Sequence, residues 1–235
     1  MRRSVKPVDM SIAERYKKIS DNVYTAAQHC GRNPDEISIL AVSKTVPHTH
    51  VQEAIDSGIT ILGENRIQEA KFKIPLLHGA FSMHMIGHLQ SNKSTDAVKL
   101  FDMIHSIDKI STARALNAEA EKSGKIQKIL IQIKTHEEDT KSGISPEESL
   151  KLAENIVLLK NLELQGVMTI GPLTDDTAIT RRAFRETSAV LVKLNLELGL
   201  KMRHVSMGMS GDFRIAVEEG STILRIGSSI FGVRI

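Results

Sequence analysis

The chain has 235 residues, of which 41% are hydrophobic, and α/β barrels of this length often bury one core as a single domain. Lys and Arg number 31 against 28 Asp and Glu, a formal net charge of +3 that is too small and too dispersed for a nucleic-acid-binding surface. The basic start is followed by a polar amphipathic stretch, and no run approaches membrane-spanning length, so we expect a cytoplasmic protein with no membrane or nucleic-acid partner.

The first predicted element is a helix. Residues 10–30 carry apolar side chains at helical spacing, from Ile12 to Ala26, and the pattern ends near Gly31. We expect Cys30 to be a buried residue of this helix. As the only cysteine it cannot form an internal disulfide, which favours a reducing compartment.

Eight short apolar runs follow at fairly even intervals and predict strands: 37–43, 59–63, 81–86, 103–107, 128–133, 162–170, 202–207 and 222–226. Segments with helical periodicity separate them: 48–57, 65–77, 109–122, 146–160 and 176–198, with shorter connections at 91–99 and 212–218. Eight strands that alternate with helices favour a (β/α)8 TIM barrel, here with an extra N-terminal helix and one domain over residues 1–235. An open doubly wound sheet is disfavoured because no glycine-rich turn follows the first strand.

Lys44 closes the first predicted strand. In such barrels the active site lies at the carboxyl ends of the strands, and a partly desolvated lysine there favours the neutral amine that attacks a carbonyl group. A lysine that only extends its ammonium group to solvent at a strand end is the simpler interpretation. Lys134 ends the fifth strand in the same way, whereas Lys93 and Lys141 lie in loops and are weaker candidates.

Two small-residue turns follow the last two strands. Residues 206–212 (Ser-Met-Gly-Met-Ser-Gly-Asp) and 227–229 (Gly-Ser-Ser) offer hydroxyls, backbone N–H groups and glycines, and barrels of this class often bind phosphate at these two loops. Either turn alone could be a plain turn, with Ser210 or Asp212 capping a helix. The pair favours a phosphate site. An amine that faces such a site suits pyridoxal phosphate (PLP).

Arg225 lies within an otherwise apolar strand and needs a polar partner. Its guanidinium could donate to the pyridine nitrogen of PLP and leave that nitrogen unprotonated. A salt bridge to Glu218 or Glu219 is equally compatible with the sequence.

The second and third strands also end in polar residues. Asn65 could bind the ring hydroxyl of PLP or cap the next helix, and His84 could line the barrel interior or be an ordinary core residue. The pairs His48/His50 and His84/His88 lack the Cys or carboxylate companions of a metal site, so we expect no metal.

Six ordered motifs resemble the pyridoxal phosphate homeostasis protein family, itself similar to the N-terminal barrel of alanine racemase. They are Ala41-Val-Ser-Lys-Thr, Gly63-Glu-Asn, Ile86-Gly-x-Leu-Gln-Ser-Asn-Lys, Thr140-Lys-Ser-Gly, Ser206-Met-Gly-Met-Ser and Arg225-Ile-Gly-Ser-Ser-Ile-Phe-Gly. The resemblance spans nearly the whole chain. Two positions depart from the family pattern: Met83 replaces a tryptophan, and Gly211 stands where an acidic residue is common.

By this resemblance Lys44 carries PLP as a Schiff base. Ser206, Gly227 and Ser228 would bind the phosphate and Arg225 would face the pyridine nitrogen. Asn65, His84 and Met209 would complete the cofactor site.

The resemblance implies a role in PLP homeostasis. A racemase needs a second base, which in alanine racemase is a tyrosine from another domain and subunit, and the only tyrosines here lie in the leading helix. We therefore expect a non-enzymatic, monomeric carrier that buffers PLP and delivers it to PLP-dependent apo-enzymes. The alternatives are a PLP-dependent racemase or lyase and, more distantly, a Schiff-base aldolase.

Overall fold

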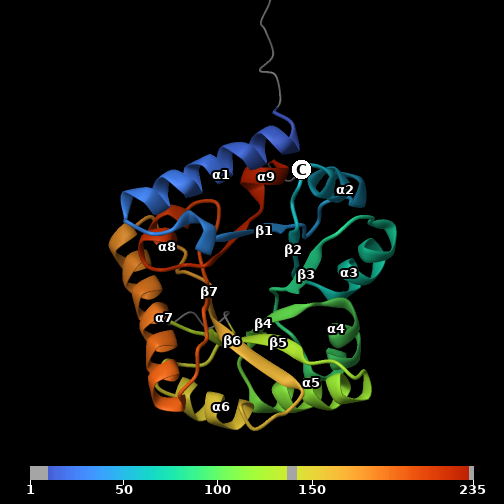
Figure 1. Cartoon of the computed structure of the whole chain (residues 1–235), viewed down its shortest axis with the longest axis vertical. Helices are drawn as coiled ribbons and strands as arrows, with labels where there is room; N and C mark the ends of the chain where they lie inside the picture. The colour runs from blue at the N-terminus through green and yellow to red at the C-terminus, as the bar shows by residue number, and fades with distance from the viewer. Residues whose placement is uncertain (1–9, 137–141, 233–235) are drawn as a thin grey trace, which may run out of the picture.

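A computed structural model of the chain describes residues 10–136 and 142–232. Eight parallel strands follow one another in chain order around a closed barrel, with β8 paired to β1 (Figure 1). The strands are β1 Ser38–Val42, β2 Ile61–Glu64, β3 Ser82–Met85, β4 Met103–Ile107, β5 Gln127–Ile133, β6 Leu162–Thr169, β7 His204–Ser206 and β8 Ile223–Ile226. The predicted barrel is confirmed, and each predicted strand overlaps an observed one.

Helices surround the barrel (Figure 1). They are α1 Ile12–His29, α2 His48–Asp56, α3 Ile67–Lys73, α4 Ser94–Leu100, α5 Ile110–Lys122, α6 Ser149–Ile156, α7 Thr177–Leu198, α8 Phe213–Glu218 and α9 Ser228–Phe231. Short 3-10 turns occur at Pro34–Glu36, Ile74–Leu76 and Ser91–Lys93. Of the helices described, none has the length and apolar character needed to cross a membrane.

The leading helix α1 covers the outside of the barrel beside α2, α8 and α9 (Figure 1). Ser11 and Glu14 form a capping box at its start, which satisfies free N–H groups of the first turn. Its inner face buries Ile12, Ile19 and Val23. The remaining short helix after β8, α9, could not cover this side alone, so α1 completes the helical layer.

Three expectations need correction. Cys30 is exposed, because it is the C-cap of α1 and lies beyond the last buried turn of that helix. The helix expected at 146–160 is shorter, since Pro146 lies in a turn before α6 and the chain turns again after Ile156. The helix expected at 65–77 ends at Lys73 and continues as the 3-10 turn at Ile74–Leu76.

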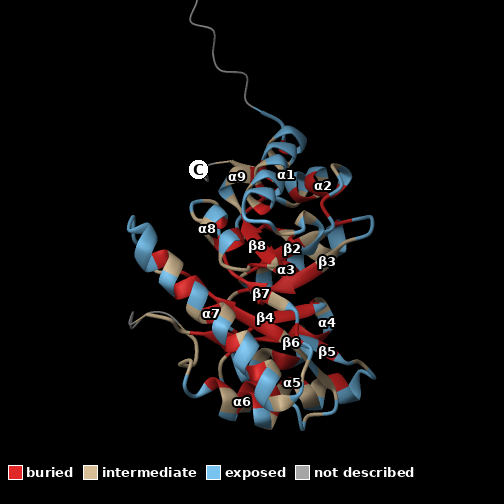
Figure 2. Cartoon of the chain, turned by 60° about the vertical axis from the view of Figure 1, so that its left-hand side comes forward, coloured by how far each residue is buried: buried red, intermediate tan, exposed pale blue. Residues whose placement is uncertain are grey.

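Most residues of the strands are buried, and the less buried ones include the first residues of β1 and β6 (Figure 2). A large apolar cluster lies between strands and helices, and a smaller one that includes Leu40 and Val42 fills the barrel interior. On β1, Ala41 belongs to the outer cluster, as the two-residue alternation of a strand requires. The same alternation, continued beyond the strand, places Lys44 on the interior side of the barrel mouth.

Candidate cofactor site

The turns after β1, β7 and β8 meet at one rim of the barrel. A groove of about 1430 Å³ is lined by Thr45, next to Lys44, by Gly211 after β7 and by Ser228 and Ser229 after β8. It continues along α1, which makes it larger than a typical small-ligand pocket. Of the residues expected to hold the cofactor, Ser228 lines this groove, whereas Lys44, Ser206 and Arg225 are not among its lining residues. The fold thus places the turn of Lys44 beside the two small-residue turns, as the strand order predicts.

The two small-residue turns are bonded to each other. The Ser229 N–H donates to Ser210 Oγ over 3.4 Å. Asp212 holds the N-cap position of α8 but makes no side-chain bond to that helix. Its Oδ1 instead accepts from the N–H of Met209 at 2.5 Å. The prediction that the Asp212 side chain caps a helix is therefore wrong.

Gly208 is strongly favoured in the turn after β7. Its φ is +89°, and a Cβ built there would lie 2.5 Å from the Cβ of Ala216. A side chain at this position would strain the turn, because both the backbone conformation and the space favour glycine.

Arg225 is buried, with 5% of its surface exposed. Its Nη1 donates to Ser206 Oγ over 2.9 Å and its Nη2 donates to the carbonyl oxygen of Thr169 over 2.8 Å. Burial lowers the pKa of Arg225 to about 10, and the carboxylate of Asp212 opposes that change. The guanidinium is therefore still a cation at neutral pH.

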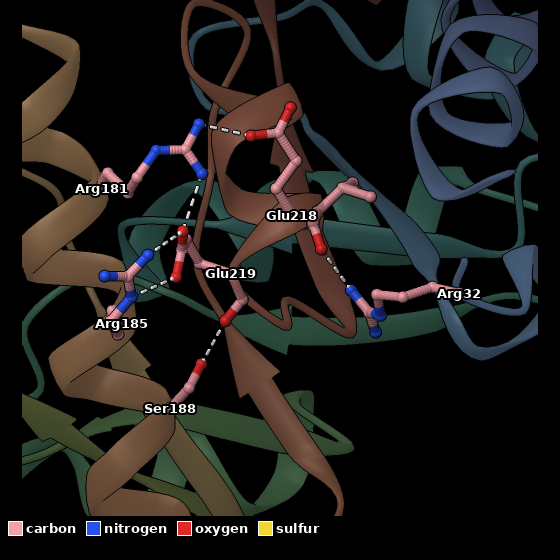
Figure 3. A network of polar contacts seen from close by, with 7 residues as sticks. Arg32, Arg181, Arg185, Ser188, Glu218 and Glu219 are labelled. Atoms are coloured by element: carbon pink, nitrogen blue, oxygen red, sulfur yellow. Dashed lines mark hydrogen bonds and ion pairs between the residues drawn. The ribbon is translucent and has the colours of Figure 1, made fainter. Parts of the chain in front are cut away.

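The alternative of a salt bridge from Arg225 to Glu218 or Glu219 is wrong. Figure 3 shows both glutamates paired with arginines of α7: Arg181 contacts both of them and Arg185 contacts Glu219. On the other side, Arg32 donates to two main-chain carbonyls at and just after the end of α8. These bonds hold α8, and with it the turn before it and β8 after it, between α7 and the loop after α1.

The turn that carries Lys44 is held from outside the barrel. Lys44 is half-buried. The next residue, Thr45, has a φ of +61°, which is unfavourable for a β-branched side chain. Its N–H donates to Glu69 Oε2 over 2.7 Å, and this bond helps to maintain the strained turn.

A buried ion pair lies on the other side of this turn. Lys73 Nζ is 2.7 Å from Glu64 Oε1 and donates to the carbonyl oxygen of Ser43 over 2.6 Å. The Ser43 hydroxyl donates to the same carboxylate oxygen over 2.7 Å. Burial raises the pKa of Glu64, while Lys73 and Ser43 act against it. This pair is not predicted by the sequence pattern, although a glutamate that ends an apolar strand is a signal for one.

Asn65 lies at the same rim, half-buried after β2. Its carbonyl packs so closely on Gly87 that a Cβ there would be 2.2 Å from the oxygen. The N-cap of α3 is Arg66, with no side-chain capping bond, so the helix-cap interpretation of Asn65 is wrong. Met209, which is 40% exposed, lies in the turn after β7.

His84 contacts His105, which is not among the predicted site residues. His84 Nδ1 is 3.0 Å from His105 Nε2, and His105 Nδ1 is 3.0 Å from Ser206 Oγ. Ser206 thus bonds both Arg225 and His105, and its predicted contact with phosphate stays a prediction. The signal for His105 was available, since it is two residues from the interior Met103 on the same strand.

The competing lysines differ in position. Lys134 is half-buried after β5, and Lys93 ends the 3-10 turn that follows β3. Lys141 lies outside the described residues. Among those described, no three His, Cys, Asp or Glu side chains gather as metal ligands would.

Comparison with known proteins identifies the family. The profile of the "Alanine racemase, N-terminal domain" family matches residues 15–235. The pyridoxal phosphate homeostasis protein of Vibrio cholerae is 39% identical over 234 residues, which cover 95% of this chain and 97% of that protein. The chain belongs to the pyridoxal phosphate homeostasis protein family.

Solved structures agree with this family assignment. The structure of PipY from Synechococcus elongatus with PLP bound has a TM-score of 0.85 and 32% identity, and the match covers 94% of this chain and all of PipY. Alanine racemase from Clostridium difficile has a TM-score of 0.76 at 17% identity, and the match covers 92% of this chain but 56% of the racemase. That second likeness shows a shared barrel fold only.

Proposed function

We propose that this member of the homeostasis protein family binds PLP covalently and reversibly at Lys44, buffers its concentration and delivers it to apo-enzymes. The observation that supports the proposal is that Thr45, next to Lys44, lines one groove together with Gly211 after β7 and Ser228 after β8. The name and the bound ligand of the relatives described above support it.

The donors of the site fit a phosphate ester on an aromatic ring. Gly227 and Ser228, with Met209 in the neighbouring turn, would hold the phosphate through hydroxyl and main-chain N–H groups. Arg225 would donate to the ring nitrogen and Asn65 to the ring hydroxyl. The buried, charged guanidinium is the observation that suits an unprotonated pyridine nitrogen.

Bound PLP supplies an aldehyde that condenses reversibly with a primary amine. Lys44 would provide this amine from the interior side of the barrel mouth. Because Arg225 stays protonated, it would donate a hydrogen bond to the ring nitrogen without giving up a proton. Such a contact would favour storage of the cofactor over carbanion chemistry.

The positions of the tyrosines favour a carrier over a racemase. The chain has two tyrosines, and Tyr16 and Tyr24 both line a hollow with Ser38 and Thr60, at the starts of β1 and β2. Lys44 lies at the opposite end of β1. Neither tyrosine can therefore serve as the second base beside Lys44 of the same chain. We take the protein to act as a cytoplasmic monomer whose partners are PLP-dependent apo-enzymes.

The test of attachment is borohydride reduction of the PLP-loaded protein followed by peptide mass mapping. We expect a pyridoxyl adduct on Lys44 and its loss in Lys44→Arg, with Lys134→Arg as the matched control. An adduct on Lys134 or Lys93 instead would refute the site.

Two further assays separate the carrier from an enzyme. Loaded protein mixed with a PLP-dependent apo-enzyme should restore the activity of that enzyme. Incubation with L- and D-amino acids should leave their chirality unchanged over many equivalents. Turnover at the rate of a metabolic enzyme would establish the racemase alternative.

A further inference from the structure

A row of polar side chains, buried except at Ser82, crosses the barrel interior. Its members, here called the histidine chain, come from three strands: Ser82 and His84 on β3, His105 on β4 and Ser206 on β7. Successive members are 3.0 Å apart, from Ser82 Oγ to His84 Nε2, from His84 Nδ1 to His105 Nε2 and from His105 Nδ1 to Ser206 Oγ. His105 and Ser206 are fully buried.

The two ends of the histidine chain bind side chains of opposite charge. At one end the Arg225 guanidinium donates to Ser206 Oγ over 2.9 Å, and arginine can only donate. At the other end the Ser82 hydroxyl donates to Asp102 Oδ2 over 3.1 Å, and an ionised carboxylate can only accept.

These ends permit one arrangement of protons in which every contact is a hydrogen bond. Ser206 accepts from Arg225 and donates to His105 Nδ1, so the His105 proton is on Nε2. His105 then donates to His84 Nδ1, and the His84 proton is also on Nε2, directed at Ser82. Ser82 donates to Asp102.

The reverse arrangement leaves defects at both ends. With protons on both Nδ1 atoms, His105 would donate to Ser206, and the Ser206 proton would lose its acceptor in the histidine chain. Ser82 would donate to His84 Nε2, and two oxygens, Ser82 Oγ and Asp102 Oδ2, would face each other at 3.1 Å with no proton between them. The defect at Ser206 is fully buried, where it costs about 1–3 kcal/mol. The Ser82–Asp102 contact is open to solvent, so the buried end decides the direction.

We infer that the histidine chain carries hydrogen bonds in one direction only, from Arg225 to Asp102, and that it positions the Arg225 guanidinium for the cofactor ring nitrogen. Ser206 and the Thr169 carbonyl hold two N–H groups of the guanidinium, which fixes its plane. His105 fixes the Ser206 hydroxyl in turn. Ser206 and His105 are therefore positioning residues. The positioning of Arg225 for the cofactor ring rests on the proposed function, but the direction of the hydrogen bonds in the histidine chain does not.

The direction is measured on the cofactor-free protein. Long-range proton–nitrogen correlation spectra of the 15N-histidine-labelled protein at pH 7 report the tautomer of each ring, and single histidine variants assign the signals. We expect both His84 and His105 to be neutral with the proton on Nε2. A proton on Nδ1 of either ring would overturn the inference.

The positioning role is tested with a pair of variants at one site. His105→Leu removes the acceptor of the Ser206 proton, and we expect the dissociation constant for PLP to rise by roughly tenfold or more. His105→Asn can place its Oδ1 near the former Nδ1, and should restore most of the affinity. Equal affinities of wild type and His105→Leu would refute the role, as would the absence of any rescue in a folded His105→Asn.

The outcomes separate this inference from the proposed function. If wild-type protein forms no adduct at Lys44, the proposed function fails, while the tautomers of the cofactor-free protein still decide the direction of the chain. If the adduct forms and the tautomers are those of the reverse arrangement, the inference alone fails.

Discussion

Lys73 Nζ lies 2.7 Å from Glu64 Oε1, and the same ammonium group donates to the main-chain carbonyl of Ser43, one residue before Lys44. The carboxylate and the ammonium group are both buried. This ion pair therefore supports the turn of Lys44 from the outside of the barrel.

Removal of one member of the pair should be costly. Lys73→Met leaves the buried Glu64 carboxylate without its counter-charge, with only the Ser43 hydroxyl as donor, and removes the donor to the Ser43 carbonyl. We expect the free energy of unfolding to fall by about 3–5 kcal/mol in urea titrations. The double variant Glu64→Met/Lys73→Met should recover most of this loss, because it buries no unpaired charge. A double variant less stable than Lys73→Met would contradict the account.

Two glycines of the turn after β7 provide a matched pair of substitutions. Gly208→Ala places a Cβ 2.5 Å from Ala216 Cβ at a φ of +89°, and we expect a loss of about 2 kcal/mol or more. Gly211→Ala meets no atom within 4 Å and should change stability by less than about 0.5 kcal/mol. Thermal unfolding of both proteins checks this, and equal effects would argue against the turn geometry.

Burial lowers the pKa of His84 from its usual 6.5 to about 4, and His204 and Lys128 add to this while Asp102 opposes it. Below about pH 6.5 the unfolded chain binds a proton that the folded protein does not. The free energy of unfolding should therefore fall between pH 7 and pH 4, by about 3 kcal/mol from this one group.

His105 also lowers the free energy of unfolding as the pH falls. Burial lowers its pKa well below 6.5, and the neighbouring positive charge of Arg225 and the rings of His84 and His204 contribute. Urea unfolding of wild type and His84→Gln at several pH values checks the contribution of His84. The profile of His84→Gln should be flatter. A His84→Gln profile parallel to that of wild type would show that His84 does not titrate as stated.

The arginine network beside α8 should matter more than an exposed ion pair. Glu219 accepts from both Arg181 and Arg185 with its side chain only 9% exposed, so Glu219→Ala should cost about 1–2 kcal/mol. The control is Asp21→Ala, which removes the exposed pair with Lys17 and should cost less than about 0.5 kcal/mol. Equal losses in chemical unfolding would mean that the network does not anchor α8.

Much of the candidate site could be predicted from local sequence patterns. Lys44 follows an apolar run, and the turns 206–212 and 227–229 follow the last two strands, so strand order alone predicts that they share one rim. The hydrogen-bond partners of Arg225 could not be predicted in this way. Several oxygens were chemically suitable, and the sequence favoured Glu218 and Glu219 equally with the cofactor, whereas the fold gives those glutamates to α7 and leaves Arg225 with Ser206 and Thr169.

The amino-acid sequence alone established the barrel and the place of Lys44, because strand alternation and strand order are local properties that repeat along the chain. Only the tertiary structure joined His105 to Ser206, which are 101 residues apart, and Lys73 of α3 to Glu64 of β2. The reason is physical. A buried polar group must find a partner, but closure of the barrel, and not the residue type, decides which partner lies within 3 Å.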